Sequence, residues 1–152
     1  MIDVKLDIKA IPVPLIYQPI YKIIMLLAIL KFGTARPYNS TFLKLHLYMW
    51  ALRSDDNYQI LLTIKNKKRD SIVPWIFEPS LERIVTLAVM NGFCKRSILS
   101  GELQIQILDS GITLLNKIEE MKLFTEDILK IKTIGIIPQN AIVRANNKWE
   151  IL

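Results

Sequence analysis

The sequence has little of what catalytic and covalent chemistry most often needs. Its 152 residues include one cysteine, Cys94, and one histidine, His46. A single cysteine excludes an intramolecular disulfide, which argues against a disulfide-stabilised secreted domain and favours a reducing compartment. Glycine-rich phosphate loops, the GxSxG motif and the HExxH motif are also missing. We therefore expect no enzyme, no catalytic residue, no metal site and no cofactor.

The titratable residues suggest no strong catalytic pair. Cys94 and His46 could act together only if the fold brought them into contact. A buried thiol and an ordinary helix histidine are the simpler interpretation. The paired carboxylates at 119–120 and 126–127 have lysines within three or four residues, a spacing typical of ion pairs on helix surfaces.

A long hydrophobic run is missing as well. Lys22 and Lys31 interrupt the most apolar stretch and leave only residues 23–30 between them, whereas a membrane-spanning helix needs ~20 apolar residues. The N-terminus lacks the features of a signal peptide, so we expect a cytoplasmic protein without a membrane segment. Yet 51% of the residues are hydrophobic and the mean hydropathy is +0.29. This composition favours a surface that a partner covers over an unusually dense core.

The net charge of +6 lies entirely in the first half of the chain. Residues 1–76 contain 11 Lys and Arg against 5 Asp and Glu, whereas residues 77–152 contain 9 of each. The densest basic run is Lys65, Lys67, Lys68 and Arg69. These four residues are the candidates for non-specific contact with DNA phosphates. The alternative is a charge run that contacts only solvent.

Periodicity and turn residues predict mostly helices. Residues 4–11 alternate as a strand within an N-terminal arm over residues 1–16. Helices are predicted where apolar spacing follows a capping residue or proline. The first covers 20–32, after Pro19 and before Gly33 as C′, and the second covers 41–53, capped by Asn39 or Ser40. The others are a short helix after 54–56, helices over 81–91, 111–121 and 126–134, and a short helix from Pro138. Asn146-Asn147 suggests a turn before a closing strand over 149–152. One domain over 1–152 accounts for the chain.

Residues 79–121 are the most informative segment. They read helix, strand, Ser100-Gly101 turn, strand and helix, with strands at 93–99 and 103–108. This order resembles the second half of a winged helix, although Asp109 replaces the threonine of the usual helix entry and Gly111 comes one residue early. The predicted fold is therefore mainly α with a small β-wing, a winged-helix-like core with extra N- and C-terminal elements.

The predicted helix over 81–91 is poorly suited to reading DNA sequence. Its buried stripe should be Leu81, Ile84, Val85 and Ala88. The exposed positions are then Glu82, Arg83, Thr86, Val89 and Met90. Base edges are read by polar side chains on such a face, and a glutamate repels phosphate.

Aromatic residues are the candidate partner contacts. Trp75 and Phe77 lie in a proline-flanked loop, and Tyr48 and Trp50 lie on the predicted helix over 41–53. Tryptophan and tyrosine are enriched where binding energy concentrates in interfaces. The alternative for each is an ordinary place in the core.

Four segments together resemble a known protein family. They are YQPIYKIIMLLAIL (17–30), PSLERIVTLAVMNGF (79–93), LDSGITLLNKI (108–118) and LFTEDILKI (123–131). Their apolar positions are similar to those of the middle, accessory components of bacterial ABC-three-component anti-phage defence systems of the Lamassu type. The resemblance implies a non-catalytic winged-helix subunit between an SMC-like coiled-coil ATPase and an effector nuclease, with possible DNA contact inside the complex. The alternative is a stand-alone winged-helix DNA-binding transcriptional regulator.

Overall fold

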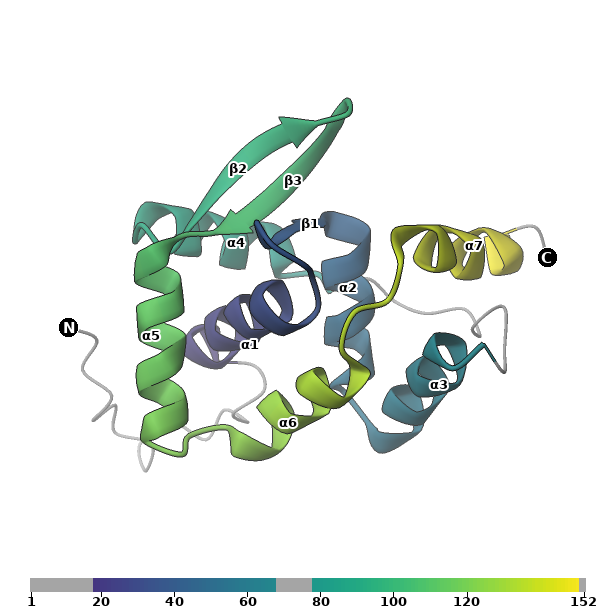
Figure 1. Cartoon of the computed structure of the whole chain (residues 1–152), viewed down its shortest axis with the longest axis horizontal. Helices are drawn as coiled ribbons and strands as arrows, with labels where there is room; N and C mark the ends of the chain where they lie inside the picture. Colours follow the sequence, from purple (N-terminus) through teal and green to yellow (C-terminus); the bar gives the residue numbers. More distant parts are fainter. Residues whose placement is uncertain (1–17, 68–77, 151–152) are drawn as a thin grey trace.

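The computed structural model describes residues 18–67 and 78–150 of the chain (Figure 1). Within these residues it is mainly helical, with one small antiparallel sheet. The elements in chain order are α1 (Pro19–Phe32), β1 (Asn39–Thr41), α2 (Phe42–Ala51), α3 (Asp55–Lys65), α4 (Leu81–Met90), β2 (Cys94–Leu99), β3 (Glu102–Ile107), α5 (Asp109–Glu120), α6 (Thr125–Ile134) and α7 (Gln139–Glu150). The predicted fold class is confirmed. The predicted N-terminal arm and its strand lie outside the described residues.

Helix α1 is the centre of the core. Pro19 opens it, and every residue from 23 to 30 is buried, as expected for a helix that is apolar on all sides. Figure 1 shows α1 surrounded by α2, α4, α5 and α6, and α1 contacts all four. The helix ends at Gly33 as predicted, although Gly33 is its C-cap, with φ −97°, and not a C′ residue. Space requires the glycine instead, because a Cβ there would lie 3.0 Å from the Tyr48 ring.

A short strand, β1, precedes α2 where the sequence suggested only a helix cap. Ser40 pairs with Ile105 of β3, so the sheet has the order β1-β3-β2. The cap of α2 is Thr41, whose side chain accepts a hydrogen bond from the Lys44 main-chain N–H. A three-residue strand has too few positions to show an alternating pattern, which is why the sequence did not reveal it.

The predicted wing is confirmed as the β2–β3 hairpin. Ser100 and Gly101 both have positive φ angles, 53° and 79°, as a two-residue hairpin turn requires. The hairpin projects from the helical body in Figure 1. Helix α4, the hairpin and α5 are the helix, wing and helix predicted over residues 79–121.

The end of the described chain differs from the prediction. Residues 139–150 form one continuous helix, α7, so the predicted turn at 146–147 and the strand beginning at 149 are wrong. Packing favours the helix, since α7 contacts α2 and α3 and its Ile142 is fully buried. Among the described helices, none combines the length and apolarity that crossing a bilayer requires.

Candidate functional site

The wing and α4 form the candidate site. Cross-strand pairs place Cys94, Arg96 and Ile98 of β2 on one face of the hairpin, opposite Ile107, Ile105 and Leu103. At the base, Cys94, Ile105 and Ile107 are buried in the core. Towards the tip, Ile98 is 73% exposed and Leu103 45% exposed. The apolar face of the sheet therefore continues beyond the body of the protein, where no described residue covers it.

Helix α4 lies beside this face. Its buried residues are Leu81, Ile84, Val85 and Ala88, which confirms the predicted stripe. Glu82, Arg83 and Met90 are exposed, and Met90 is the most exposed large apolar residue of the described chain at 76%. The helix in the recognition position thus presents one acidic, one basic and one large apolar side chain to solvent.

Arg96 joins the wing to α4. Its guanidinium forms an ion pair with Glu82 at 2.5 Å and donates to the Thr86 hydroxyl at 3.0 Å. The pair is exposed and contributes little to stability. The pair matters for DNA contact instead, because the arginine that could contact phosphate is paired with a carboxylate. The surface that remains suits an apolar partner better than base edges.

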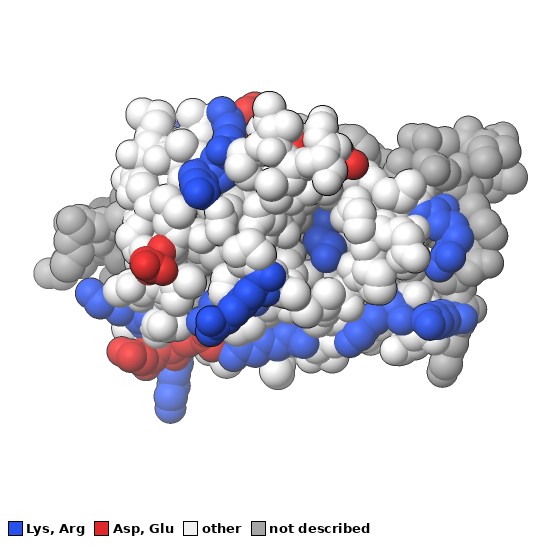
Figure 2. All heavy atoms as spheres, turned by 45° about the horizontal axis from the view of Figure 1, so that its top comes forward, with Lys and Arg blue, Asp and Glu red and all other residues white. Residues whose placement is uncertain are grey.

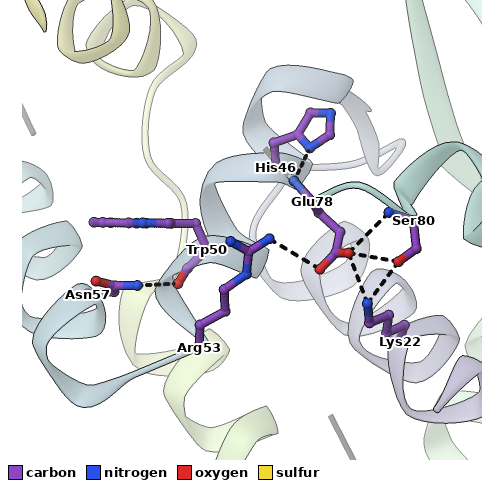
Figure 3. A network of polar contacts seen from close by, with 7 residues as sticks. All are labelled: Lys22, His46, Trp50, Arg53, Asn57, Glu78 and Ser80. Carbon is purple, nitrogen blue, oxygen red and sulfur yellow. Dashed lines mark hydrogen bonds and ion pairs between the residues drawn. The ribbon is translucent and has the colours of Figure 1, made fainter. Parts of the chain in front are cut away.

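A buried carboxylate holds the start of α4 against α1 and α2 (Figure 3). One oxygen of Glu78 accepts from Lys22 Nζ at 2.9 Å and from the Ser80 hydroxyl at 2.7 Å, and the other lies 3.5 Å from Arg53. Burial alone would raise the pKa of Glu78, but hydrogen bonds from Lys22 and Ser80 lower it to about 2. Glu78 is therefore ionised at physiological pH and fixes the beginning of the helix.

His46 takes part in the same network. Its Nδ1 accepts a hydrogen bond from the Glu78 main-chain N–H at 3.0 Å, so the ring is neutral with its proton on Nε2. Burial lowers the pKa of His46. Sequence reasoning assigned His46 to a packed or partly exposed helix position and missed its partner, because His46 and Glu78 are far apart in the chain.

Two predicted partner contacts are wrong because their side chains lie in the core. Tyr48 is fully buried and Trp50 is 5% exposed. The Tyr48 hydroxyl donates to the Gly135 carbonyl at 2.5 Å and accepts from the Ile137 N–H at 3.3 Å. Helix α2 is covered by its neighbours, so its aromatic residues supply packing and not a docking surface. Trp75 and Phe77 lie outside the described residues.

The predicted phosphate-binding run is only partly described. Lys65 ends α3, and its ammonium donates to the Thr133 carbonyl at 3.2 Å. Lys67 is exposed just beyond the helix. Lys68 and Arg69 lie outside the described residues. The structure therefore places Lys65 against the end of α6, a contact that the basic run in the sequence did not reveal.

Cys94 is buried and unsuited to nucleophilic chemistry. It is 2% exposed, and burial raises the pKa of its thiol to about 12, so the reactive thiolate is scarce at neutral pH. In residues 18–67 and 78–144, no three His, Cys, Asp or Glu side chains come together as a metal-ligand set.

Comparison of the chain with protein-family models, with curated proteins and with solved structures finds no match in any of the three.

Proposed function

We propose that this chain is a non-catalytic accessory subunit of a cytoplasmic bacterial anti-phage complex, joining an SMC-like ATPase to an effector nuclease. The resemblance of its apolar segments supplies the identity of the complex. The observation that best supports a subunit role is the exposed Ile98–Leu103 pair on the wing. A projecting hairpin with an apolar face fits insertion into a hollow on a partner protein.

Several features favour a protein partner for this surface. Leu99, on the other face of the tip, is also 44% exposed and lies opposite Glu102, so the tip adds one more apolar side chain beside a carboxylate. Complete burial of Ile98 and Leu103 would contribute roughly 1.5–3 kcal/mol each. The adjacent Arg96–Glu82 pair would supply the polar rim that surrounds such apolar contacts in stable interfaces.

The test is copurification of tagged protein from its host, with mass spectrometry of the proteins that accompany it. A large coiled-coil ATPase should copurify with the wild type in stoichiometric amount. The Ile98→Ser/Leu103→Ser variant should lose it while keeping its circular dichroism spectrum. The matched control is Met121→Ser/Leu129→Ser, which removes two apolar side chains of similar exposure, 60% and 59%, outside the wing. Retention of the ATPase by the wing variant, or its loss from both variants, would contradict the proposed surface.

A stand-alone DNA-binding regulator is the second candidate. It is favoured by Arg83 on α4 and Lys95 on β2, which are both exposed. This function predicts a homodimer that shifts one DNA sequence and loses that specificity with Arg83→Ala. Glu82, on the same helix, opposes it because a carboxylate repels the DNA backbone.

A further inference from the structure

The C-terminal ends of three helices meet around one tyrosine. The Tyr48 ring lies against Gly33, which follows α1, and the Tyr48 hydroxyl donates to the carbonyl of Gly135, which follows α6. Lys65, in the last turn of α3, reaches the Thr133 carbonyl of α6. Segments far apart in the sequence therefore lie side by side at these helix ends.

Each of these helices brings basic side chains to that region. Lys31, Lys65 and Lys132 lie in the last turns of α1, α3 and α6. Two of them face the same ring, since the ammonium groups of Lys31 and Lys132 lie 5.9 and 4.8 Å from the centroid of Phe32. Exposed residues follow two of the helices, and we define the basic cluster as Lys31, Arg36, Lys65, Lys67 and Lys132.

Most of this charge is not neutralised by carboxylates. Among the described residues, Glu119 pairs with Lys132 at 2.6 Å, and no carboxylate lies within 4 Å of the other four cluster residues. The helix-end carbonyls are already satisfied from inside, since buried Lys44 donates to Gly33 at 2.9 Å and Tyr48 donates to Gly135. Figure 2 shows a face of the molecule on which several Lys and Arg side chains lie along the lower margin, with Asp or Glu side chains among them at the left.

Helix stabilisation accounts for only part of the cluster. A lysine in the last turn of a helix interacts favourably with the helix dipole. That explains Lys31, Lys65 and Lys132 one helix at a time. It does not explain why Arg36 and Lys67 add further positive charge beyond the helix ends, or why the three helices end together.

We propose that the basic cluster binds the sugar-phosphate backbone of duplex DNA without sequence preference. The side chains are point charges spread over three helix ends, which suits phosphates and not base edges. Single-strand binding needs aromatic rings that bases can stack on, and the Phe32 ring beside Lys31 and Lys132 already faces their two ammonium groups. The cluster takes no residue from α4 or the β2–β3 hairpin, and it does not depend on the proposed subunit role.

The experiment measures DNA affinity of the full-length chain at several salt concentrations. The probe is a fluorescent duplex of about 30 base pairs and arbitrary sequence. Each phosphate contact contributes about −0.9 to the slope of log K against log salt. Lys31→Gln/Lys65→Gln/Lys67→Gln should therefore lower the steepness of that slope by roughly 2–3. Replacing the same three lysines by arginine should preserve the slope.

The matched control removes three charges elsewhere, through Arg83→Gln/Lys95→Gln/Lys117→Gln on α4, β2 and α5. It should change the slope much less than the cluster variant. Equal reductions of the slope in both variants would show that only net charge matters. A reduction confined to the control would place the DNA on α4 and the wing instead. Either result would overturn the proposal, as would tighter binding of single strands or no salt-dependent binding by the wild type. Copurification of the ATPase tests the subunit role separately, since the cluster variant should retain it.

Discussion

The main-chain N–H of Glu78 donates a hydrogen bond to Nδ1 of His46, 3.0 Å away. Through its carboxylate, the same residue is joined to Lys22 of α1. Glu78, which precedes α4, thus connects that helix to α1 through an ion pair. It connects the helix to α2 through a hydrogen bond that only a neutral histidine can accept (Figure 3). The orientation of α4, and with it the wing, should respond to changes at these residues.

Stability should fall as the pH drops below about 6.5. The unfolded chain binds a proton at histidine near pH 6.5, whereas burial holds the pKa of His46 lower in the folded state. Protonation therefore favours unfolding in this window. Thermal unfolding between pH 8 and 5 would show a declining midpoint. In His46→Asn, which keeps an acceptor but does not titrate, the decline between pH 6.5 and 5 should be smaller. An identical decline in both proteins would assign the effect to other groups.

Glu78→Gln should destabilise the fold by about 2–3 kcal/mol, because removing one member of a buried ion pair leaves its partners without compensation. Lys22 and Arg53 are partly exposed, at 13% and 31%, which keeps the loss below that of a fully buried pair. In the wild type, this contribution should be complete above pH 4.5 and disappear as the pH falls towards 2. Urea unfolding at pH 7 provides the measurement. Glu102→Gln, at the exposed wing tip, is the control and should change stability by less than ~0.5 kcal/mol.

Lys44→Met should stabilise the protein at neutral pH. The Lys44 side chain is 6% exposed, and burial lowers its pKa from 10.5 to about 8. The folded state therefore opposes its charge, and the penalty is complete below pH 8 and removed as the pH rises through 10.5. Methionine fills similar space without a charge, although it loses the bond to Gly33. The midpoint of urea unfolding should be higher for the variant at pH 7, and the difference should shrink by pH 10. A less stable variant at pH 7 would show that this bond outweighs the cost of burial.

Gly111→Ala should destabilise the junction of the wing and α5. A Cβ at this position would lie 2.5 Å from the Phe93 carbonyl and 2.9 Å from the Ile107 side chain. Overpacking of this kind typically costs about 1–3 kcal/mol. Asn116→Ala, at an exposed position of the same helix, should be neutral or slightly stabilising. Chemical unfolding of both variants checks the difference, and a stable Gly111→Ala protein would indicate that α5 can move away.

Local sequence predicted the elements that depend on nearby residues. Pro19 marks the start of α1, and Ser54 caps α3 by accepting from the Asn57 N–H. Ser100-Gly101 fixes the wing turn, since both residues adopt the left-handed conformation that this turn requires. Each of these signals acts over a few residues, so chain order alone is enough to reveal it.

The surfaces proposed for partner and phosphate contact could not be predicted in the same way. An apolar or aromatic residue on a helix looks the same in sequence whether it is buried, as Tyr48 is, or exposed, as Met90 is. Burial depends on which other elements cover that face, and this is decided by packing between distant segments. The same limit explains why a basic run at 65–69 was visible while Lys31 and Lys132 were not linked to it.

The sequence by itself determined a mainly helical chain with a wing, a fully apolar central helix and a basic first half, because composition and periodicity act locally. Only the tertiary structure decided that β1 completes the sheet, that Glu78 and His46 meet, and that α1, α3 and α6 end together. Those features join residues separated by tens of positions, and their energy comes from burial and charge pairing that exist only once the chain is packed.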